Sequence, residues 1–130
     1  MPLSPQQRPL YEVKAGLFKG LAHPFRIRIL ELLAASAEVS VAALQDATGL
    51  EASHLSQHLA VLRRHRLVES ERRASHVYYR LADEKVAELL SVARALLRDI
   101  VRSDGARAAD VDELPELAPS TTPRRRDAGS

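Results

Sequence analysis

The chain contains no cysteine and no tryptophan, and aromatic residues make up only 4% of its 130 residues. The absence of cysteine excludes disulfides, thiol chemistry, iron–sulfur clusters and thiolate zinc sites, and it fits a reducing cytoplasm. No apolar run approaches the roughly 20 residues that span a membrane, and the N-terminal segment lacks the apolar core of a signal peptide. Hydrophobic residues still reach 45%. The composition therefore predicts one small cytoplasmic domain with a core of aliphatic helices.

Positive charge is concentrated in one segment of the chain. The formal net charge is only +2 at pH 7, yet residues 52–80 contain six arginines against two glutamates. Residues 104–130 contain four arginines against six acidic residues. A basic patch confined to one element is the electrostatic pattern expected for a polyanionic partner such as a nucleic acid.

The spacing of apolar residues predicts two helices in the first third of the chain. Residues 1–8 contain two prolines and two glutamines, and we expect them to be flexible. A first helix is expected over about 9–21. His23 and Pro24 interrupt it, and proline suits the first turn of a second helix. That helix should end near Ser36, and His23 is interpreted as a helix-start residue rather than a ligand.

A third and a fourth helix are predicted with a glycine turn between them. Ser40 is a favourable N-cap for a short helix over 41–47, and Gly49 supplies the turn. The fourth helix should begin at Glu51 or Ser53. Three leucines at i, i+4 and i+7 give it a buried stripe, and its polar and basic side chains lie mostly on the other faces; the leucines are Leu55, Leu59 and Leu62. This arrangement is typical of a helix-turn-helix.

The last ordered elements are predicted to be a β-hairpin and a long helix. The stretches "VESE" and "HVYYRL" alternate as strands do, and residues 73–75 can form the turn between them. A helix should then run from the N-cap Asp83 to about Arg102, with an apolar surface wider than one stripe. Such a surface on a terminal helix indicates burial against a second chain as well as its own. Residues 103–130 are rich in Pro, Ala and acidic residues, which predicts a disordered tail.

The segments "LAHPFRIRILELL" and "VSVAALQDATGLEASHLSQHLAVLRRHRLVESERRASHVYYRL", with the helix that follows, resemble the ArsR/SmtB family of winged helix-turn-helix repressors. The likeness covers about residues 9–102. Its specific parts are the "HPxRxxIL" helix start, the "SxxSQHLxxLR" recognition helix, "LV" entering the wing and "YYRL" leaving it.

The resemblance implies an α+β, mainly helical fold of about five helices plus a β-hairpin wing. It also implies a homodimer joined through its first and last helices, with one recognition helix per protomer in successive major grooves. Such a dimer would bind operator double-stranded DNA and repress transcription until an inducer acts.

The residues expected to contact DNA lie in the recognition helix and the wing. Serine and glutamine side chains can hydrogen-bond to base edges or phosphates, and glutamine suits adenine. Arginines are natural partners of phosphate. The predicted DNA-binding residues are Ser53, His54, Ser56, Gln57, His58, Arg63, Arg64, Arg72, Arg73 and His76.

His54 and His58, one helical turn apart, are open to three interpretations. They can contact DNA or lie on a polar surface, they can make structural hydrogen bonds, or they can ligate a metal. The third interpretation is weak, because an HxxxH pair without a third ligand nearby rarely makes a metal site. His76, in the proposed wing, can contact DNA or be merely solvated.

The metal sites of the resembled family are not matched at the corresponding positions. A Cys-x-Cys pair in some members and an Asp, His, His, Glu set in others correspond here to Ser40, Ala42, Asp83, Lys85, Leu96 and Asp99. The sequence therefore predicts neither known type of metal site and no cofactor. A non-standard site made of the remaining histidines and carboxylates stays open.

An enzyme is the function class with the least support. The sequence has no glycine-rich phosphate loop and no nucleophile elbow with a Ser–His–Asp order. Two alternatives to a self-sufficient repressor remain. One is a DNA-binding subunit whose inducer is sensed by a separate protein, and the other is a metal-responsive repressor with a non-standard site. A small-molecule or protein co-regulator is thus a possible partner.

Overall fold

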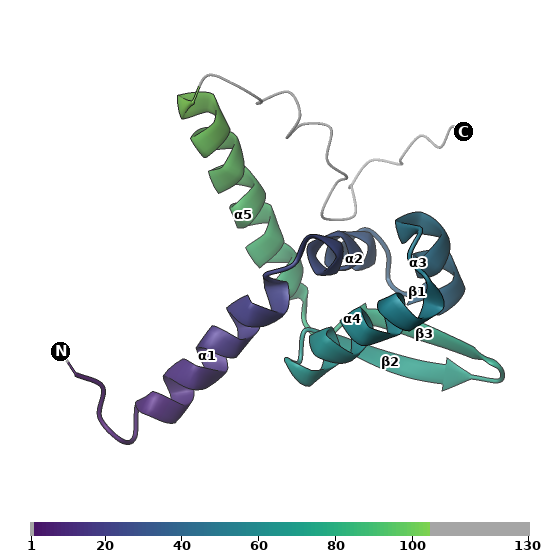
Figure 1. The fold of residues 1–130 in the computed structure, drawn as a ribbon, viewed down its shortest axis with the longest axis horizontal. Helices are drawn as coiled ribbons and strands as arrows, with labels where there is room; N and C mark the ends of the chain where they lie inside the picture. The colour runs from purple at the N-terminus through teal and green to yellow at the C-terminus, as the bar shows by residue number, and fades with distance from the viewer. Residues whose placement is uncertain (1, 105–130) are drawn as a thin grey trace.

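The computed structural model describes residues 2–104 and forms five helices and one antiparallel sheet (Figure 1). The elements in chain order are α1 (Arg8–Leu21), α2 (Pro24–Ala34), β1 (Val39–Ser40), α3 (Val41–Thr48), α4 (Ala52–Arg64), β2 (Val68–Arg73), β3 (His76–Leu81) and α5 (Glu84–Ser103). The expected α+β, mainly helical winged fold is confirmed.

Three helices begin at residues whose side chains accept a hydrogen bond from the backbone of the first turn. Ser40 Oγ accepts from Ala43 N–H at 3.0 Å, and Asp83 Oδ1 accepts from Lys85 N–H at 2.8 Å. His23 Nδ1 accepts from the N–H two residues later at 3.1 Å, ahead of the proline that opens α2. These bonds satisfy donors that a helix start leaves unpaired. The predicted N-caps of α3 and α5 and the helix-start role of His23 are confirmed.

The core is built around α2, which contacts α1, α3, α4, α5 and β3. Aliphatic side chains from all the larger elements meet there, and α4 contributes the three leucines of its predicted stripe. The buried cluster consists of Ile29, Leu30, Leu33, Leu44, Leu55, Leu59, Leu62, Leu67, Val68, Tyr79, Val86 and Leu90. Burial of this stripe fixes which face of α4 is turned outward.

The sheet has one more strand than the sequence predicted. The short strand β1 pairs with β3, which also pairs with β2, so the strand order is β1-β3-β2. The hairpin turn is also tighter than expected, because Arg73 pairs with His76 as the last residue of β2. Only Ala74 and Ser75 form the turn, and Ala74 has a φ of 56°.

The element boundaries differ from the expected ones by one or two residues. Arg8 belongs to α1 rather than to the N-terminal segment 1–8, and α2 ends at Ala34 rather than near Ser36. Ser4 and Gln7 exchange hydrogen bonds of 3.0 and 3.1 Å just before α1. The expected flexibility of the N-terminal segment stays a prediction. The expected tail at 103–130 lies outside the described residues, apart from Ser103, which ends α5, and Asp104.

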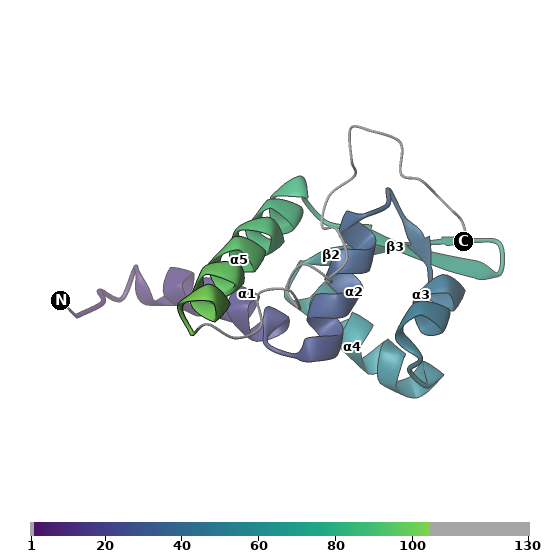
Figure 2. The same ribbon diagram turned by 90° about the horizontal axis from the view of Figure 1, so that it is seen from above.

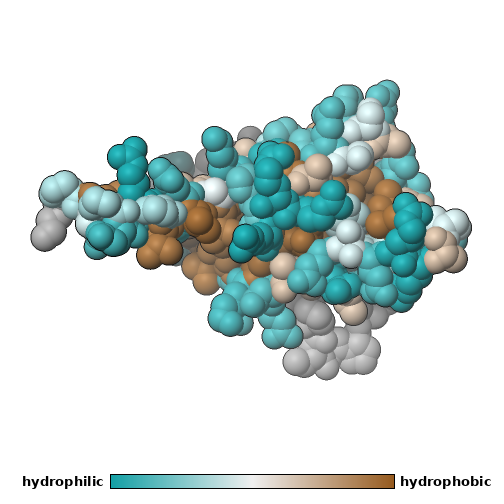
Figure 3. Space-filling view, turned by 90° about the horizontal axis from the view of Figure 1, so that it is seen from below, coloured by the Kyte–Doolittle hydropathy of each residue, from teal (hydrophilic) through white to brown (hydrophobic). Residues whose placement is uncertain are grey.

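The molecule has two distinct ends. α1 and α5 project from the body on one side, whereas α3 and the tip of the β2–β3 hairpin lie on the other (Figures 1 and 2). In the space-filling view, hydrophobic residues gather along the end that carries α1 (Figure 3). Within residues 2–104, none of the helices has the length and apolarity needed to cross a membrane.

Candidate nucleic-acid interface

The two faces of α4 differ sharply in burial. Leu55, Leu59 and Leu62 are at most 3% exposed. The polar residues that precede and follow them in each turn are exposed, and these are Ser53, His54, Ser56 and Gln57 at the start and Arg63 and Arg64 at the end. Six of the seven predicted contact residues on this helix therefore lie on its outer surface. An exposed row of hydroxyl, amide, imidazole and guanidinium groups can reach base edges and phosphates in a major groove.

The turn before α4 positions this helix against α3. Gly49 ends α3 with a φ of 72°, a left-handed conformation that favours glycine. Its N–H donates to Gln45 O at 2.8 Å. Thr48 Oγ1 donates to Leu44 O at 2.8 Å and accepts from Leu50 N–H at 3.3 Å. The predicted glycine turn of the helix-turn-helix is confirmed.

His58 differs from the other predicted contact residues on α4. It is half-buried, its ring centroid lies 4.4 Å from that of His23, and its Nδ1 lies 3.5 Å from Arg26 Nη1. Burial lowers the pKa of His58, and the nearby positive charges of His23, Arg26 and His54 lower it further. Of the three interpretations of this residue, structural hydrogen bonding has the geometric support. Its DNA contact stays a prediction.

Arg26 connects three helices. Its Nε donates to Gly20 O at 2.7 Å and its Nη2 donates to Lys19 O at 3.2 Å, so it satisfies carbonyls at the end of α1. Its Nη1 meets His58 on α4. This role of Arg26 does not follow from the sequence, although Arg26 is the arginine of the "HPxR" motif. The partners lie up to 32 residues away, and no local pattern indicates such contacts.

The wing presents Arg72, Arg73 and His76 as exposed side chains. Arg73 forms an ion pair with Glu38, and its guanidinium carbon lies 4.0 Å from the centroid of the Tyr78 ring. The hydrogen bond to Glu38 raises the pKa of Arg73 above its ordinary value. The ion pair and the ring contact therefore hold the Arg73 side chain against its neighbours. Arg72 differs, because no ion pair within residues 2–104 involves it.

Two more arginines near the interface are held by the hairpin. Arg63 Nη1 donates to Tyr79 Oη at 3.2 Å, which links the end of α4 to β3. Arg80 lies 3.2 Å from a Glu69 carboxylate oxygen and 3.5 Å from one of Glu71. The charge of Arg80 is therefore compensated within the sheet, which leaves the positive charge of the hairpin nearer its tip.

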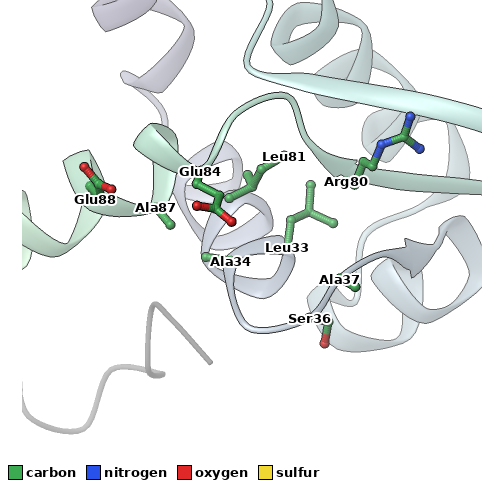
Figure 4. Close-up of a pocket in the computed structure, with 9 residues that line it drawn as sticks. All are labelled: Leu33, Ala34, Ser36, Ala37, Arg80, Leu81, Glu84, Ala87 and Glu88. Carbon is green, nitrogen blue, oxygen red and sulfur yellow. The ribbon is translucent and has the colours of Figure 1, made fainter. Parts of the chain in front are cut away.

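A cavity of about 530 Å³ lies away from α4, between the end of α2, β3 and the start of α5 (Figure 4). Leu33, Ala34 and Leu81 form its apolar part, and the Glu84 carboxylate points toward them while the Arg80 guanidinium points away. None of the predicted DNA-binding residues lines it. No cluster of three or more metal-ligating side chains occurs in the described part of the chain.

Comparison with known proteins supports the same reading of α3 and α4. Residues 21–71 match a helix-turn-helix domain family. The chain is 46% identical over 109 residues to the HTH-type transcriptional regulator Rv0081 of Mycobacterium tuberculosis. The matched region covers 84% of this chain and 93% of that protein. The crystal structure of Rv0081 superposes with a TM-score of 0.69 over 75% of this chain and 98% of its own.

Two further relatives are a winged helix-turn-helix domain and a repressor. The homodimeric winged helix-turn-helix domain of Mb0332 from Mycobacterium bovis, described as a possible ArsR-family regulator, is 34% identical. Its TM-score is 0.67, over 75% of this chain and 89% of that one. A biofilm growth-associated repressor of Agrobacterium fabrum is 38% identical over 96 residues, 74% of this chain and 80% of that protein. The likeness thus extends through sequence as well as fold along most of the chain, and the protein belongs to the ArsR family of winged helix-turn-helix transcriptional regulators.

Proposed function

We propose that the protein is a repressor that binds operator double-stranded DNA as a homodimer through the outer face of α4 and the β2–β3 wing. Residues 9–102 would combine the DNA-binding and dimerisation functions. The observation that carries the proposal is the division of α4 into a leucine stripe that is at most 3% exposed and an exposed polar face. The relative from A. fabrum that is named a repressor supports the direction of regulation.

Within this proposal, Gln57 is the residue that reads sequence. It is exposed near the middle of α4 and its amide can form two hydrogen bonds with an adenine edge. Ser53, Ser56 and His54 flank it on the same helix. Arg63, Arg64, Arg72, Arg73 and His76 would contact phosphates, which position the protein without reading bases. His58 would act mainly by holding α4 against the start of α2.

The homodimer rests on the exposed apolar residues of α1 and α5. Leu10, Val13 and Phe18 on α1 and Val92 and Leu96 on α5 are between 57% and 71% exposed. Surfaces of this kind usually mark a protein contact. The homodimeric state of the Mb0332 domain supports a second copy of this chain as the partner.

A groove between α1, α2 and α5 lies within this apolar region. It has a volume of about 630 Å³, and Phe18, Ile27 and Leu97 are among the residues that line it. Glu31 also lines the groove and is only 8% exposed. Burial raises the pKa of Glu31, and the charges of Arg94 and Arg28 oppose this shift. A second copy would cover the groove and remove its apolar lining from water.

The proposed function includes a small-molecule co-regulator that binds in a separate cavity. None of the exposed apolar residues proposed for the dimer contact lines the cavity in Figure 4, and its volume falls within the size range of small-molecule sites. Its apolar part and the Glu84 carboxylate suit a small molecule with an apolar body and a cationic group. Saturation-transfer NMR with a fragment set should detect such binding, and Ala87→Phe, which narrows the cavity, should abolish it. Fragment binding that is unchanged in the variant would exclude this site.

Selection of binding sites from a random duplex pool is the direct test of operator recognition. The expected result is a near-palindromic site whose half-sites lie about 34 Å apart, one helical turn. Gln57→Ala should lose about 1–3 kcal/mol of binding free energy on that site and little on random DNA. Ser91→Ala, on the polar side of α5, is the control and should bind both duplexes as the wild type does. If selection enriches no motif and Gln57→Ala binds every duplex normally, the proposal fails.

A further inference from the structure

A second basic site lies beside the C-terminal end of α4, on the side of α1 and α2. It is a hollow of about 320 Å³ between α1, α2 and α4. Five residues line it, and four of them are basic: Lys19, Arg26, Val61, Arg64 and His65. Lys19 and Arg26 come from elements that the DNA-binding proposal does not use.

α1 packs closely against the segment after α4 beside this hollow. A Cβ atom on Gly20 would lie 3.0 Å from Leu67 Cδ1 and 3.1 Å from His65 Cβ, so α1 packs directly against the segment that follows α4. A Cβ atom on Gly16, one turn earlier, would lie 3.1 Å from Nδ1 of His65. The two glycines allow this close approach, and it sets Lys19 beside the end of α4.

Arg26 is the fixed cation of the hollow. It is partly buried, and its Nε and Nη2 donate to the carbonyls of Gly20 and Lys19. These bonds hold the guanidinium in place, and the carbonyls offset its charge only by the partial negative charge of a helix C-terminus. No acidic residue lines the hollow, and within residues 2–104 no ion pair involves Lys19, Arg26 or Arg64.

Grouped cations without an acidic partner raise the local potential and attract anions, and arginine with lysine suits phosphate in particular. Arg64 belongs both to this hollow and to the exposed end of α4. A phosphate bound in the hollow would therefore lie next to the DNA that α4 contacts. We propose that the hollow formed by Lys19, Arg26, Arg64 and His65 binds a phosphate group of the DNA backbone beside the α4 contact. This inference rests on the proposed function and extends its DNA contact to α1.

The test compares two lysines of the same helix. Lys19 lines the hollow, whereas Lys14 lies 5.2 Å from the centroid of the Tyr11 ring and does not line it. Lys19→Gln should weaken binding to the selected site and to random duplex alike and should reduce the log–log salt slope by about 0.9 for each protomer, or about 1.8 for the homodimer. Lys14→Gln should leave the slope at the wild-type value.

A second measurement separates DNA phosphate from a free phosphate compound. The full chain without DNA is titrated with inorganic phosphate and with pyrophosphate, and binding is followed by calorimetry. If these anions bind the wild type but not Lys19→Gln, while the salt slope stays unchanged, the hollow is an anion site but the DNA source is overturned. If Lys19→Gln changes neither the slope nor anion binding, the whole inference is overturned.

Gln57→Ala distinguishes this failure from failure of the proposed function. Suppose that Gln57→Ala loses operator discrimination while Lys19→Gln keeps the wild-type affinity and salt slope. α4 would then remain the element that reads the operator, and only the phosphate contact in the hollow would be overturned. Lys19 is exposed, so its replacement should not unfold the protein, and unchanged thermal unfolding of Lys19→Gln checks this directly.

Discussion

α4 and α5 are both amphipathic helices, but they leave chemically opposite surfaces exposed. α4 buries its three leucines and exposes hydroxyl, amide, imidazole and guanidinium groups. α5 buries only Val86 and Leu90, and it leaves Val92, Leu96 and Ile100 more than half exposed. A polar, basic face suits a hydrated polyanion, whereas an uncovered apolar face suits a protein surface. The two helices thus indicate different kinds of partner.

The largest effect is expected from placing a charge on the apolar face of α5. Leu96 is 59% exposed, and in a homodimer both copies of it would be covered. Loss of two buried leucine side chains costs about 3–6 kcal/mol per dimer, at about 1.5–3 kcal/mol each. Leu96→Glu should therefore be monomeric at micromolar concentration in analytical ultracentrifugation and should bind the operator much more weakly.

Ser91→Glu is the matched control for this substitution. It introduces the same carboxylate on an exposed position of the same helix, on the side away from the apolar residues. It should remain dimeric. A Leu96→Glu protein that keeps the wild-type mass would show that this face of α5 is not the dimer contact. The assignment of a protein partner to α5 would then be wrong.

A smaller effect is expected within the wing, where two adjacent arginines differ. Arg72→Ala should lower the log–log salt slope by about 0.9 for each protomer, or about 1.8 for the homodimer, and weaken operator and random DNA alike, because a phosphate contact carries no sequence information. From the sequence, Arg72 and Arg73 are both predicted to contact DNA. The ion pair of Arg73 with Glu38 changes this expectation, since a DNA contact by Arg73 has to replace that pair. Arg73→Ala should therefore weaken binding less.

Filter-binding titrations of both variants over a range of salt concentrations check this prediction. Glu38→Gln provides the complementary variant, because it removes the competing carboxylate and should raise the affinity for both duplexes. Equal losses in Arg72→Ala and Arg73→Ala, with no gain in Glu38→Gln, would contradict the idea that the pair restrains Arg73.

The sequence predicted what local patterns control. Ser40 and Asp83 as caps, Gly49 as the turn residue and the leucine stripe of α4 follow from propensity and periodicity within a few residues. The strand β1 was missed because two residues carry no strand signal of their own. Its pairing with β3 joins Val39 to Tyr79, forty residues later in the chain.

The candidate site divides in the same way. Exposure of the polar residues on α4 follows from helix geometry once Leu55 and its partners are buried. The different position of His58 does not, because it depends on His23 and Arg26 from the start of α2. The Glu38–Arg73 pair and the basic hollow likewise join residues from separate elements. Spacing along one helix cannot indicate these contacts.

A modest gain in stability is expected at the tip of the wing. Ala74 has a φ of 56°, and the residue after it does not have a positive φ. This is the pattern of a two-residue hairpin turn that favours glycine at its first position. Relief of the left-handed strain exceeds the entropy that glycine adds to the unfolded chain, so Ala74→Gly should raise the free energy of unfolding by about 0.5–1 kcal/mol.

Chemical denaturation of Ala74→Gly against the wild type measures this change. Ser75→Gly is the matched control, because its backbone does not need the left-handed region and glycine there should destabilise the protein slightly. A gain in Ser75→Gly and none in Ala74→Gly would mean that the strain lies elsewhere in the turn.

The smallest effect concerns the pH dependence of the contact between α4 and α2. The pKa of His58 lies below its ordinary value of 6.5 because of burial, and the charges of His23, Arg26 and His54 act in the same direction. The unfolded chain therefore binds a proton at a pH at which the folded chain does not. This contribution to stability is fully present above the unfolded pKa and is lost as the pH falls from 6.5 through the folded pKa.

Unfolding free energies at about pH 7.5 and about pH 5 test this sign through linkage. His58→Gln keeps a polar side chain beside Arg26 but cannot take up the proton, so its stability should fall less between the two pH values than that of the wild type. His76→Gln, which removes an imidazole from the exposed wing, is the control and should retain the wild-type difference. If His58→Gln loses as much stability in acid as the wild type, the imidazole cluster does not govern this part of the pH dependence. The contact of α4 with α2 would then depend on the packing of the buried leucines Leu55, Leu59 and Leu62 and not on the protonation of His58.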